Sequence, residues 1–367
     1  MTLLGAAWVV DMCAPVAAVA ETTRTTAAPP SADVRPIIGN WPADRAKVQP
    51  LGLRAVKLGG FLGQHVDASN DSLLVGLQSP LPRGIEAVAN GQKPPEEAIR
   101  LATDSDFYKW LEGACYALAY DPSRTELRAA VDKYVGLILK LQRPDGYIGT
   151  GISPAAPFDE RIRHDLYVAG HLIEAAVAHH AATGERTLLD AAVRFADFYL
   201  EAFRAKHPYF RLIGQEHPEI EIALVRLARA TGEERFIQFA ADLTRVAKLT
   251  PPLRNLRAGA GRLHAVRLCY QFAGAAELFL QSGDADLVRV LTPLWEELVT
   301  TRTYVTGGIG CNESVPDEPY DLPQTDNRRP GRDVAETCAS VSLMMLGWRM
   351  HAISEASADF DIIETIL

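Results

Sequence analysis

From Asp104 to the end of the chain, apolar residues recur at spacings of three and four, in segments of helical length that Gly, Pro and Asp residues separate. A less regular helix is expected within 50–76. Almost no segment alternates apolar and polar residues over the length of a strand, so the pattern predicts an all-α chain. The predicted helices cover 105–120, 125–142, 161–182, 187–205, 217–231, 233–248, 262–282, 284–301, 333–354 and 357–367.

A helical hairpin recurs along this region, and its turning glycines, Gly184, Gly232 and Gly283, lie about fifty residues apart. Glycine accepts the left-handed backbone that closes a helix. Stacked hairpins of this kind form toroids or solenoids, and we expect an (α/α)₆ barrel. The pattern supplies about eleven helices and stops without a cap or glycine at Leu367. The barrel is therefore expected to be incomplete at its C-terminus.

Residues 1–35 differ from the rest of the chain. Their apolar stretch ends at Ala18-Val19-Ala20, which fits the small-residue pattern before signal-peptidase cleavage, but Asp11 interrupts it and no Lys or Arg precedes it. We expect a signal-like or disordered segment over 1–35 and the barrel domain over 36–367. The expected location is secreted or periplasmic, with the cytoplasm as the alternative.

Composition limits the classes of partner. The 367 residues are 48% hydrophobic and 23% charged, which is ordinary for a globular protein. A net charge of −9 gives no basic surface for nucleic acid or anionic lipid, and no later apolar run reaches the roughly 18 residues that span a bilayer. Five scattered cysteines without a CxxC pair predict no disulfide framework.

The most polar and least helical stretch of this region is 304–338, which carries several carboxylates among glycines. A solvated acidic loop is the plain alternative to a functional role. Glu336 and Cys338 would diverge on a helix, so they could reach one metal ion only at an extended helix entrance, which is where the pattern places them. Carboxylate and thiolate would be two of the four ligands that zinc normally takes.

Histidines recur near predicted helix starts. His164 and His171 are seven residues apart and share a helix face, His217 opens one helix, and His264 stands near the start of another. At the inner ends of toroid helices, neutral imidazoles could form hydrogen bonds with sugar hydroxyls. A purely structural role is the alternative for each of them.

Seven blocks in this chain resemble, in this order, the helical core of glycoside hydrolase family 127. The resemblance covers roughly residues 50–367. It implies an (α/α)₆ barrel, followed in complete members by β-sandwich domains, and the removal of terminal β-L-arabinofuranosyl residues from plant-type glycans. It also implies a retaining mechanism with a zinc-bound cysteine thiolate as nucleophile. The blocks are DSDFYKWLEGACYAL, HDLYVAGHLIEAAVAHHAATG, HPEIEIALVRLARATG, HAVRLCYQFAG, YVTGGIGCNE, YDLP and ETCASVSLMMLGWRM.

The resemblance also implies roles for single residues. Glu313 in GCNE resembles the general acid/base, and Glu318 is its rival because the run before YDLP is one residue longer than usual. Glu336 and Cys338 in ETC resemble two Zn²⁺ ligands, while the other two are adjacent cysteines beyond Leu367, one of them the nucleophile. The residues that resemble sugar contacts are His164, His217, His264 and Glu364.

We therefore expect a family member in which this stretch of chain lacks the nucleophile, binds zinc weakly and turns over little by itself. Two alternatives belong to other classes: a noncatalytic carbohydrate-binding lobe, and another toroid sugar enzyme such as an epimerase or a lyase. The adjoining coding sequence distinguishes them, because a Cys-Cys pair followed by β-rich sequence favours the glycosidase.

Overall fold

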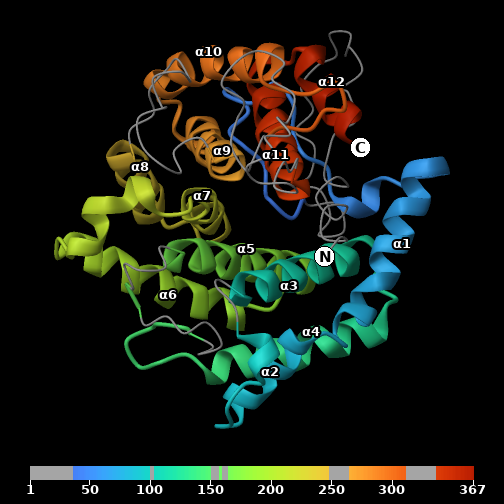
Figure 1. Cartoon of the computed structure of the whole chain (residues 1–367), viewed down its shortest axis with the longest axis vertical. Helices are drawn as coiled ribbons and strands as arrows, with labels where there is room; N and C mark the ends of the chain where they lie inside the picture. The colour runs from blue at the N-terminus through green and yellow to red at the C-terminus, as the bar shows by residue number, and fades with distance from the viewer. Residues whose placement is uncertain (1–35, 100–102, 150–156, 159–163, 248–263, 311–335) are drawn as a thin grey trace, which may run out of the picture. The chain divides into compact units, whose positions relative to one another are not determined.

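The computed structural model describes residues 36–99, 103–149, 157–158, 164–247, 264–310 and 336–367, and most of them are helical (Figure 1). Within these ranges β-structure is limited to isolated bridges, so the predicted all-α class is confirmed. The α-helices are α1 Gly60–Gly76, α2 Pro80–Ala89, α3 Thr103–Tyr120, α4 Thr125–Lys140, α5 Asp165–Thr183, α6 Thr187–Arg204, α7 Ile220–Thr231, α8 Arg235–Ala247, α9 Ala265–Ser282, α10 Ala285–Thr301, α11 Thr337–Ser354 and α12 Ser357–Ile366. Short 3-10 helices are η2 Leu53–Ala55, η3 Glu96–Ala98 and η4 Pro208–Gln215.

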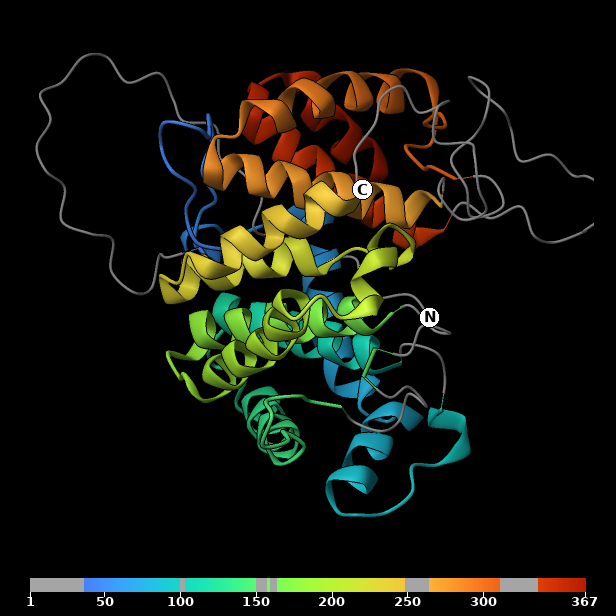
Figure 2. The same ribbon diagram turned by 90° about the vertical axis from the view of Figure 1, so that its left-hand side faces the viewer.

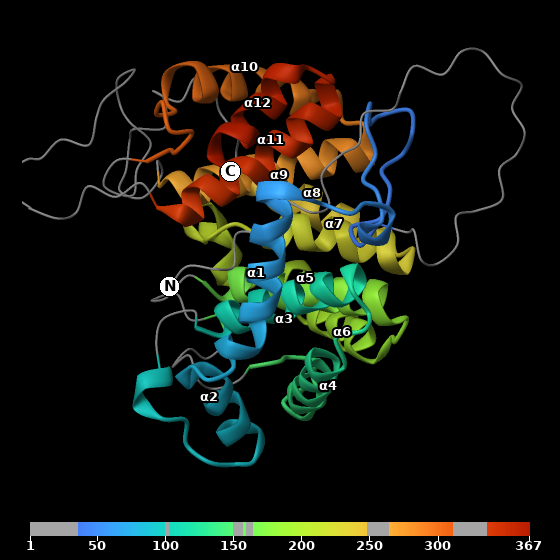
Figure 3. The same cartoon turned by 90° about the vertical axis from the view of Figure 1, so that its right-hand side faces the viewer.

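Contacts divide the chain into two units. The first unit contains Val48–Arg204 with α1 to α6, and the second contains Trp41–Lys47 and Ala205–Leu367 with α7 to α12. In the first unit α3 packs along α5, α5 packs against α6, and α2 lies against α4 (Figure 3). In the second unit α9 packs against both α7 and α11, and α8 and α10 cover this group (Figure 2, yellow to red).

The helices divide into central and covering ones. Every residue from Ala169 to His179 in α5 is buried, and so is every residue from Ile220 to Ala228 in α7. A helix that is buried on all sides must be enclosed by other elements. The covering helix α6 instead buries a single face at spacings of three and four, with the other face in solvent. The central helices include α5, α7, α9 and α11, and predicted site residues lie at or just before their starts.

The three predicted hairpin glycines close their helices in the left-handed conformation, with φ of 78°, 78° and 74° at Gly184, Gly232 and Gly283. Each of their amides donates to the carbonyl four residues earlier, at 2.7 or 2.8 Å. Glycine takes this conformation without a side-chain penalty. The predicted pattern of glycine-closed hairpins is confirmed.

A tight turn follows α4 directly. The amide of Arg143 donates to the carbonyl of Tyr147 at 2.8 Å, and the amide of Gly146 donates to the carbonyl of Arg143 at 2.9 Å. An isolated bridge between Gln142 and Ile148 flanks these bonds. Gly146 has a φ of 93°, which a residue with a side chain rarely adopts.

The same turn follows α10 in the second unit. Here the amide of Tyr304 donates to the carbonyl of Gly308 at 2.8 Å, and the amide of Gly307 donates to the carbonyl of Tyr304 at 2.9 Å. The flanking bridge joins Thr303 and Ile309, and Gly307 has a φ of 75°. We call these two structures the twin turns, because the same two bonds, bridge and positive-φ glycine recur at matching positions.

The sequence pattern does not predict α2, because Pro80, Pro82 and Gly84 are helix breakers in a helix interior. In the structure both prolines fall in the first turn of α2. Amides in the first turn have no partner within the helix, so the prolines remove no helical hydrogen bond.

Some of the predictions fall outside the described residues. The signal-like segment 1–35 does so, and so do Glu313 and Glu318. Among the helices that the structure describes, none combines the length and apolar character needed to cross a bilayer.

Candidate functional site

Three of the predicted sugar-contacting residues lie at the starts of central helices. His164 is the N-cap of α5 and His264 is the N-cap of α9, while His217 lies three residues before the first residue of α7. The first amides of a helix lack partners within the helix, so helix starts are suited to polar ligands.

The predicted start of α7 at residue 217 is wrong. The helix begins at Ile220, because Pro218 disfavours helical backbone at the residue before it and the N-cap Glu219 has a non-helical φ of 172°. His217 therefore belongs to the loop that enters α7.

In the second unit, His217 and His264 form a pair whose ring centroids are 6.2 Å apart. The ring of Tyr270, one turn into α9, lies 5.7 Å from that of His217. Nδ1 of His217 is 3.0 Å from the carbonyl of Pro218, which can only accept, so Nδ1 carries the proton. In the neutral ring Nε2 is then an acceptor, the role needed to receive a hydrogen bond from a hydroxyl group.

Two hydrogen bonds hold the residue before His217 in place. The carboxylate of Glu216 accepts from the hydroxyl of Tyr209 on η4 at 2.5 Å, and its carbonyl accepts from Nη2 of Arg267 on α9 at 2.5 Å. No repeat or motif in the sequence predicted this anchor. Its only signal was Arg267 three positions after His264, about one helical turn away on the same face.

Glu336 and Cys338 lie together at the entrance of α11. Glu336 is the N-cap, with extended angles φ −67° and ψ 137°, and Cys338 is the second residue of the helix. Glu336 is therefore extended at the helix entrance, although the helix begins at Thr337 and not at the predicted residue 333, and binding of one metal ion by the pair stays a prediction. Cys338 is exposed and forms no disulfide with another described cysteine. A carboxylate and a thiol are both zinc ligands, so these two residues suit a zinc ion as part of its ligand set.

Glu364 lies on α12 with an exposed side chain. The end of this helix packs against the second twin turn: a Cβ on Gly307 would be 2.8 Å from Cγ1 of Ile366 and 3.0 Å from its amide nitrogen. Only a glycine allows this approach. The structure thus places Glu364 near the turn that leads into the GCNE segment, while its role as a sugar contact stays a prediction.

The first unit has its own polar cluster, at the start of α5. The carboxylate of Asp165 accepts from the backbone amide of Phe158 at 2.9 Å, and the hydroxyl of Tyr147 in the first twin turn is 3.4 Å away. Burial raises the pKa of Asp165 to about 6, although the hydrogen bonds from these two donors lower it. A carboxyl group that titrates near neutrality is suited to hold or release a proton, and the sequence analysis did not single it out.

His164 and His171 are connected by one aromatic ring. Tyr167 lies between them, with ring centroids 6.0 Å from His164 and 4.5 Å from His171. His171 is buried, whereas His164 is half-buried at the helix start. The ammonium of Lys109 on α3 is 4.8 Å from the centroid of Tyr167. Of the two histidines, His164 is therefore the one placed to contact a ligand.

The chain matches a protein family described as "Beta-L-arabinofuranosidase, GH127 catalytic domain" over residues 67–367. A curated relative is the non-reducing end β-L-arabinofuranosidase of Bifidobacterium longum subsp. longum, which is 33% identical over 76% of this chain and 47% of its own length. The chain thus spans about half the length of that curated relative.

Solved structures show the same fold. A GH127 β-L-arabinofuranosidase from Geobacillus stearothermophilus T6 matches with a TM-score of 0.67 and 26% identity, over 85% of this chain and 55% of that one. A structure described as a glycoside hydrolase matches with a TM-score of 0.60 and 25% identity, over 89% of this chain and 50% of that one.

Proposed function

The chain belongs to the β-L-arabinofuranosidases of glycoside hydrolase family 127, and on that premise we propose that it is the helical catalytic part of an enzyme that removes terminal β-L-arabinofuranosyl residues. In this proposal His164, His217 and His264 bind the sugar. Glu364 is a further contact, and Glu313 is the general acid/base.

The observation that carries the proposal is the pair of histidines in the loop that enters α7 and at the start of α9. Their rings are 6.2 Å apart, and the bond of Nδ1 to the Pro218 carbonyl leaves Nε2 of His217 as an acceptor for a hydroxyl. The ring of Tyr270 adds an aromatic surface beside them, which suits the apolar C–H face of a sugar. The Glu216 anchor keeps His217 in place before any ligand arrives, which lowers the entropic cost of binding.

Glu313 performs both proton transfers in this proposal. In its protonated form it donates a proton to the oxygen of the departing group. As a carboxylate it then accepts a proton from the water that releases the sugar, which is the course of a retaining mechanism. The second twin turn, packed on the end of α12, ends at Ile309, four residues before Glu313.

Glu336 and Cys338 are the proposed zinc ligands of this chain. A zinc ion held there with further ligands would keep a cysteine sulfur ionised by lowering its pKa. The backbone of Glu336 is fixed at the N-cap, because its carbonyl accepts the first helical hydrogen bonds, from the amides of Ala339 at 3.0 Å and Ser340 at 3.2 Å. The side-chain carboxylate therefore extends from a fixed position.

Cys338→Ser should lower the zinc content of the protein sharply, because it replaces a soft thiolate with a poor ligand of similar volume. Zinc per chain is measured by elemental analysis after dialysis, in the longest form of the protein that its coding sequence allows. Cys311→Ser is the control with the same substitution and should leave zinc unchanged. Equal zinc in both variants would remove Cys338 from the site.

The proposed activity is tested with an aryl β-L-arabinofuranoside and its α-L-anomer, using the same long form of the protein. We expect hydrolysis of the β-anomer alone, and a drop in kcat/KM of about tenfold or more in His217→Ala, which loses one hydrogen-bonding group in a buried site. His65→Ala, at an exposed position on α1, is the control. Sugar binding without hydrolysis would instead favour the noncatalytic lobe, and hydrolysis unaffected by His217→Ala would exclude that residue.

A further inference from the structure

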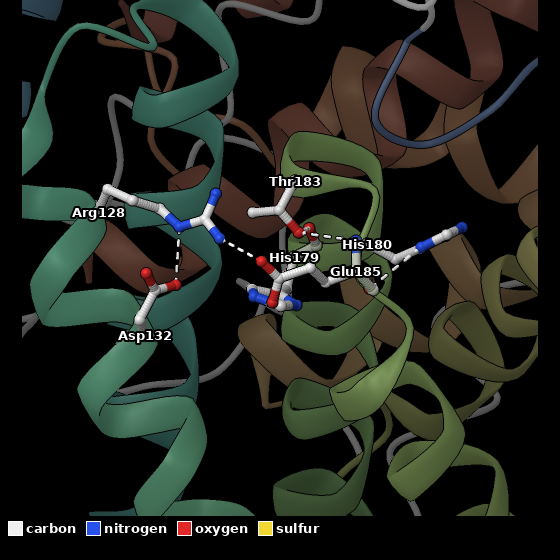
Figure 4. Close-up of polar contacts among 6 residues, drawn as sticks. All are labelled: Arg128, Asp132, His179, His180, Thr183 and Glu185. Carbon is white, nitrogen blue, oxygen red and sulfur yellow. Dashed lines mark hydrogen bonds and ion pairs between the residues drawn. The ribbon is translucent and has the colours of Figure 1, made fainter.

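Three side chains with metal-binding groups come together in the first unit, apart from every residue assigned above. Asp132 lies on α4, His179 lies near the end of α5, and Glu185 lies in the turn between α5 and α6 (Figure 4). One ligand atom from each lies within 4.8 Å of the other two. The two acidic residues are exposed, whereas His179 has no exposed surface.

His179 is the unusual member of this cluster. Neither of its ring nitrogens has a hydrogen-bond partner among the described residues, although both are buried. A buried polar group without a partner costs free energy, of the order of 1–3 kcal/mol. Burial is also the largest influence on the ring, and it holds the pKa of His179 below its ordinary value. The ring is therefore neutral near pH 7, the form in which an imidazole binds a metal.

The backbone fixes Glu185 with respect to His179. The hydroxyl of Thr183 donates to the carbonyl of His179 at 2.7 Å and accepts from the amide of Glu185 at 3.1 Å. The left-handed Gly184 between them closes α5. The hydrogen bonds that hold the turn thus involve the backbones of His179 and Glu185 themselves. Two of the three ligand residues are therefore preorganised.

The charge of the cluster is not balanced. Arg128 donates to Asp132 at 2.7 Å and also to Glu185, so one positive charge faces two carboxylates. The neutral ring of His179 adds no charge, and a net negative charge remains. A bound cation would supply the missing charge and would also give the buried nitrogen a partner.

We propose that Asp132, His179 and Glu185 form a binding site for a divalent transition metal of the zinc type. One imidazole nitrogen with two carboxylate oxygens suits zinc, whereas calcium and magnesium prefer oxygen ligands alone. Three protein ligands leave a coordination position for water. Such an ion connects α4 to the turn between α5 and α6, so its effect is to stabilise the first unit.

The probe is Zn²⁺ alone, titrated calorimetrically into the 367-residue chain carrying Cys338→Ser, which disables the other proposed zinc ligands. We expect one zinc ion per chain, and a rise in the melting temperature when zinc is added. Asp132→Asn and Glu185→Gln should each weaken zinc binding by about tenfold or more, because each removes an anionic ligand at an exposed position where the fold tolerates the change.

Glu126→Gln is the matched control, since Glu126 is an exposed acid on the same helix as Asp132, and it should bind zinc like the background protein. Arg128→Gln should bind zinc more tightly, by about tenfold, because it removes a competing positive charge. Absence of zinc binding in the background protein would overturn the proposal, and so would equal zinc affinity in Asp132→Asn, Glu185→Gln and Glu126→Gln. In either case Arg128 would be the cluster's permanent counter-ion.

Discussion

Glu277→Gln should lower the free energy of unfolding by about 3–5 kcal/mol, the range for breaking a buried ion pair on one side. Glu277 on α9 has no exposed surface. Its carboxylate accepts from Arg229 on α7, from Nε of Arg349 on α11 at 2.6 Å and from the indole of Trp41 at 3.0 Å. The neutral amide would leave two buried guanidinium groups without a counter-charge, at the point where three central helices of the second unit join.

The pH dependence of this effect has a definite sign. Burial by itself raises the pKa of Glu277, but Arg229 and Arg349 outweigh burial and hold the pKa well below its usual range. A carboxyl group with a depressed pKa stabilises the folded state above the pKa of the unfolded chain, and this stabilisation is lost as the pH falls. The difference between wild type and Glu277→Gln should therefore be full near pH 7 and shrink below about pH 5.

The measurement is urea unfolding followed by far-UV circular dichroism at several pH values. Glu296→Gln is the matched control: it makes the same substitution at an exposed position on α10, in the same unit, and should change stability by less than about 0.5 kcal/mol. If the two variants unfold alike, the ion network does not hold the three helices together.

Glu313→Gln should slow the hydrolysis of substrates with poor leaving groups by roughly 10²-fold or more, because glutamine keeps the shape of the side chain but cannot transfer a proton. Aryl substrates with activated leaving groups should be less affected in the first step, since their oxygen hardly needs protonation. Azide should restore part of the rate of the second step, because an anion replaces the water that Glu313 no longer deprotonates. The readout is kcat/KM across a series of leaving groups, in the long form of the protein.

Glu318→Gln is the control that decides the register of this segment. It lies five residues further on and has the same chemistry. If Glu318→Gln shows the dependence on leaving group and Glu313→Gln does not, Glu318 is the acid. If neither shows it, the segment is a solvated acidic loop.

Local sequence features predicted most of the fold. The spacing of apolar residues predicted α3 and α6 to within two residues at each end, because each helix buries a face with its own period. The glycines that close the hairpins could also be predicted from the sequence. The left-handed conformation of Gly184 depends on that residue itself and needs no distant partner. At the site, the same periodicity placed His164 and Glu336 near the starts of helices predicted to begin at 161 and 333, and the structure begins these helices four residues later, at Asp165 and Thr337.

Features that depend on distant partners could not be predicted in this way. The raised pKa of Asp165 comes from burial and from the charge of Asp104, 61 residues earlier, and the hydrogen bond from Tyr147 only reduces this rise. The anchor of Glu216 needs Arg267, 51 residues later. The cluster around His179 joins groups from two helices and a turn. The apolar periodicity of one segment does not predict contacts between distant residues, because such contacts form only when the helices pack together.

The twin turns have the same backbone conformation but carry different side chains. The two hydrogen bonds that they share join backbone atoms, and a glycine in each turn supplies the positive φ. The backbone conformation therefore does not depend on which side chains occupy the two positions before that glycine. Pro144 and Asp145 occupy them in one copy, and Val305 and Thr306 in the other, with Val305 96% exposed. In evolution, substitutions at the tips of these loops can therefore change the surface that the loops present, while selection for a folded protein acts on the glycines and the helices behind them.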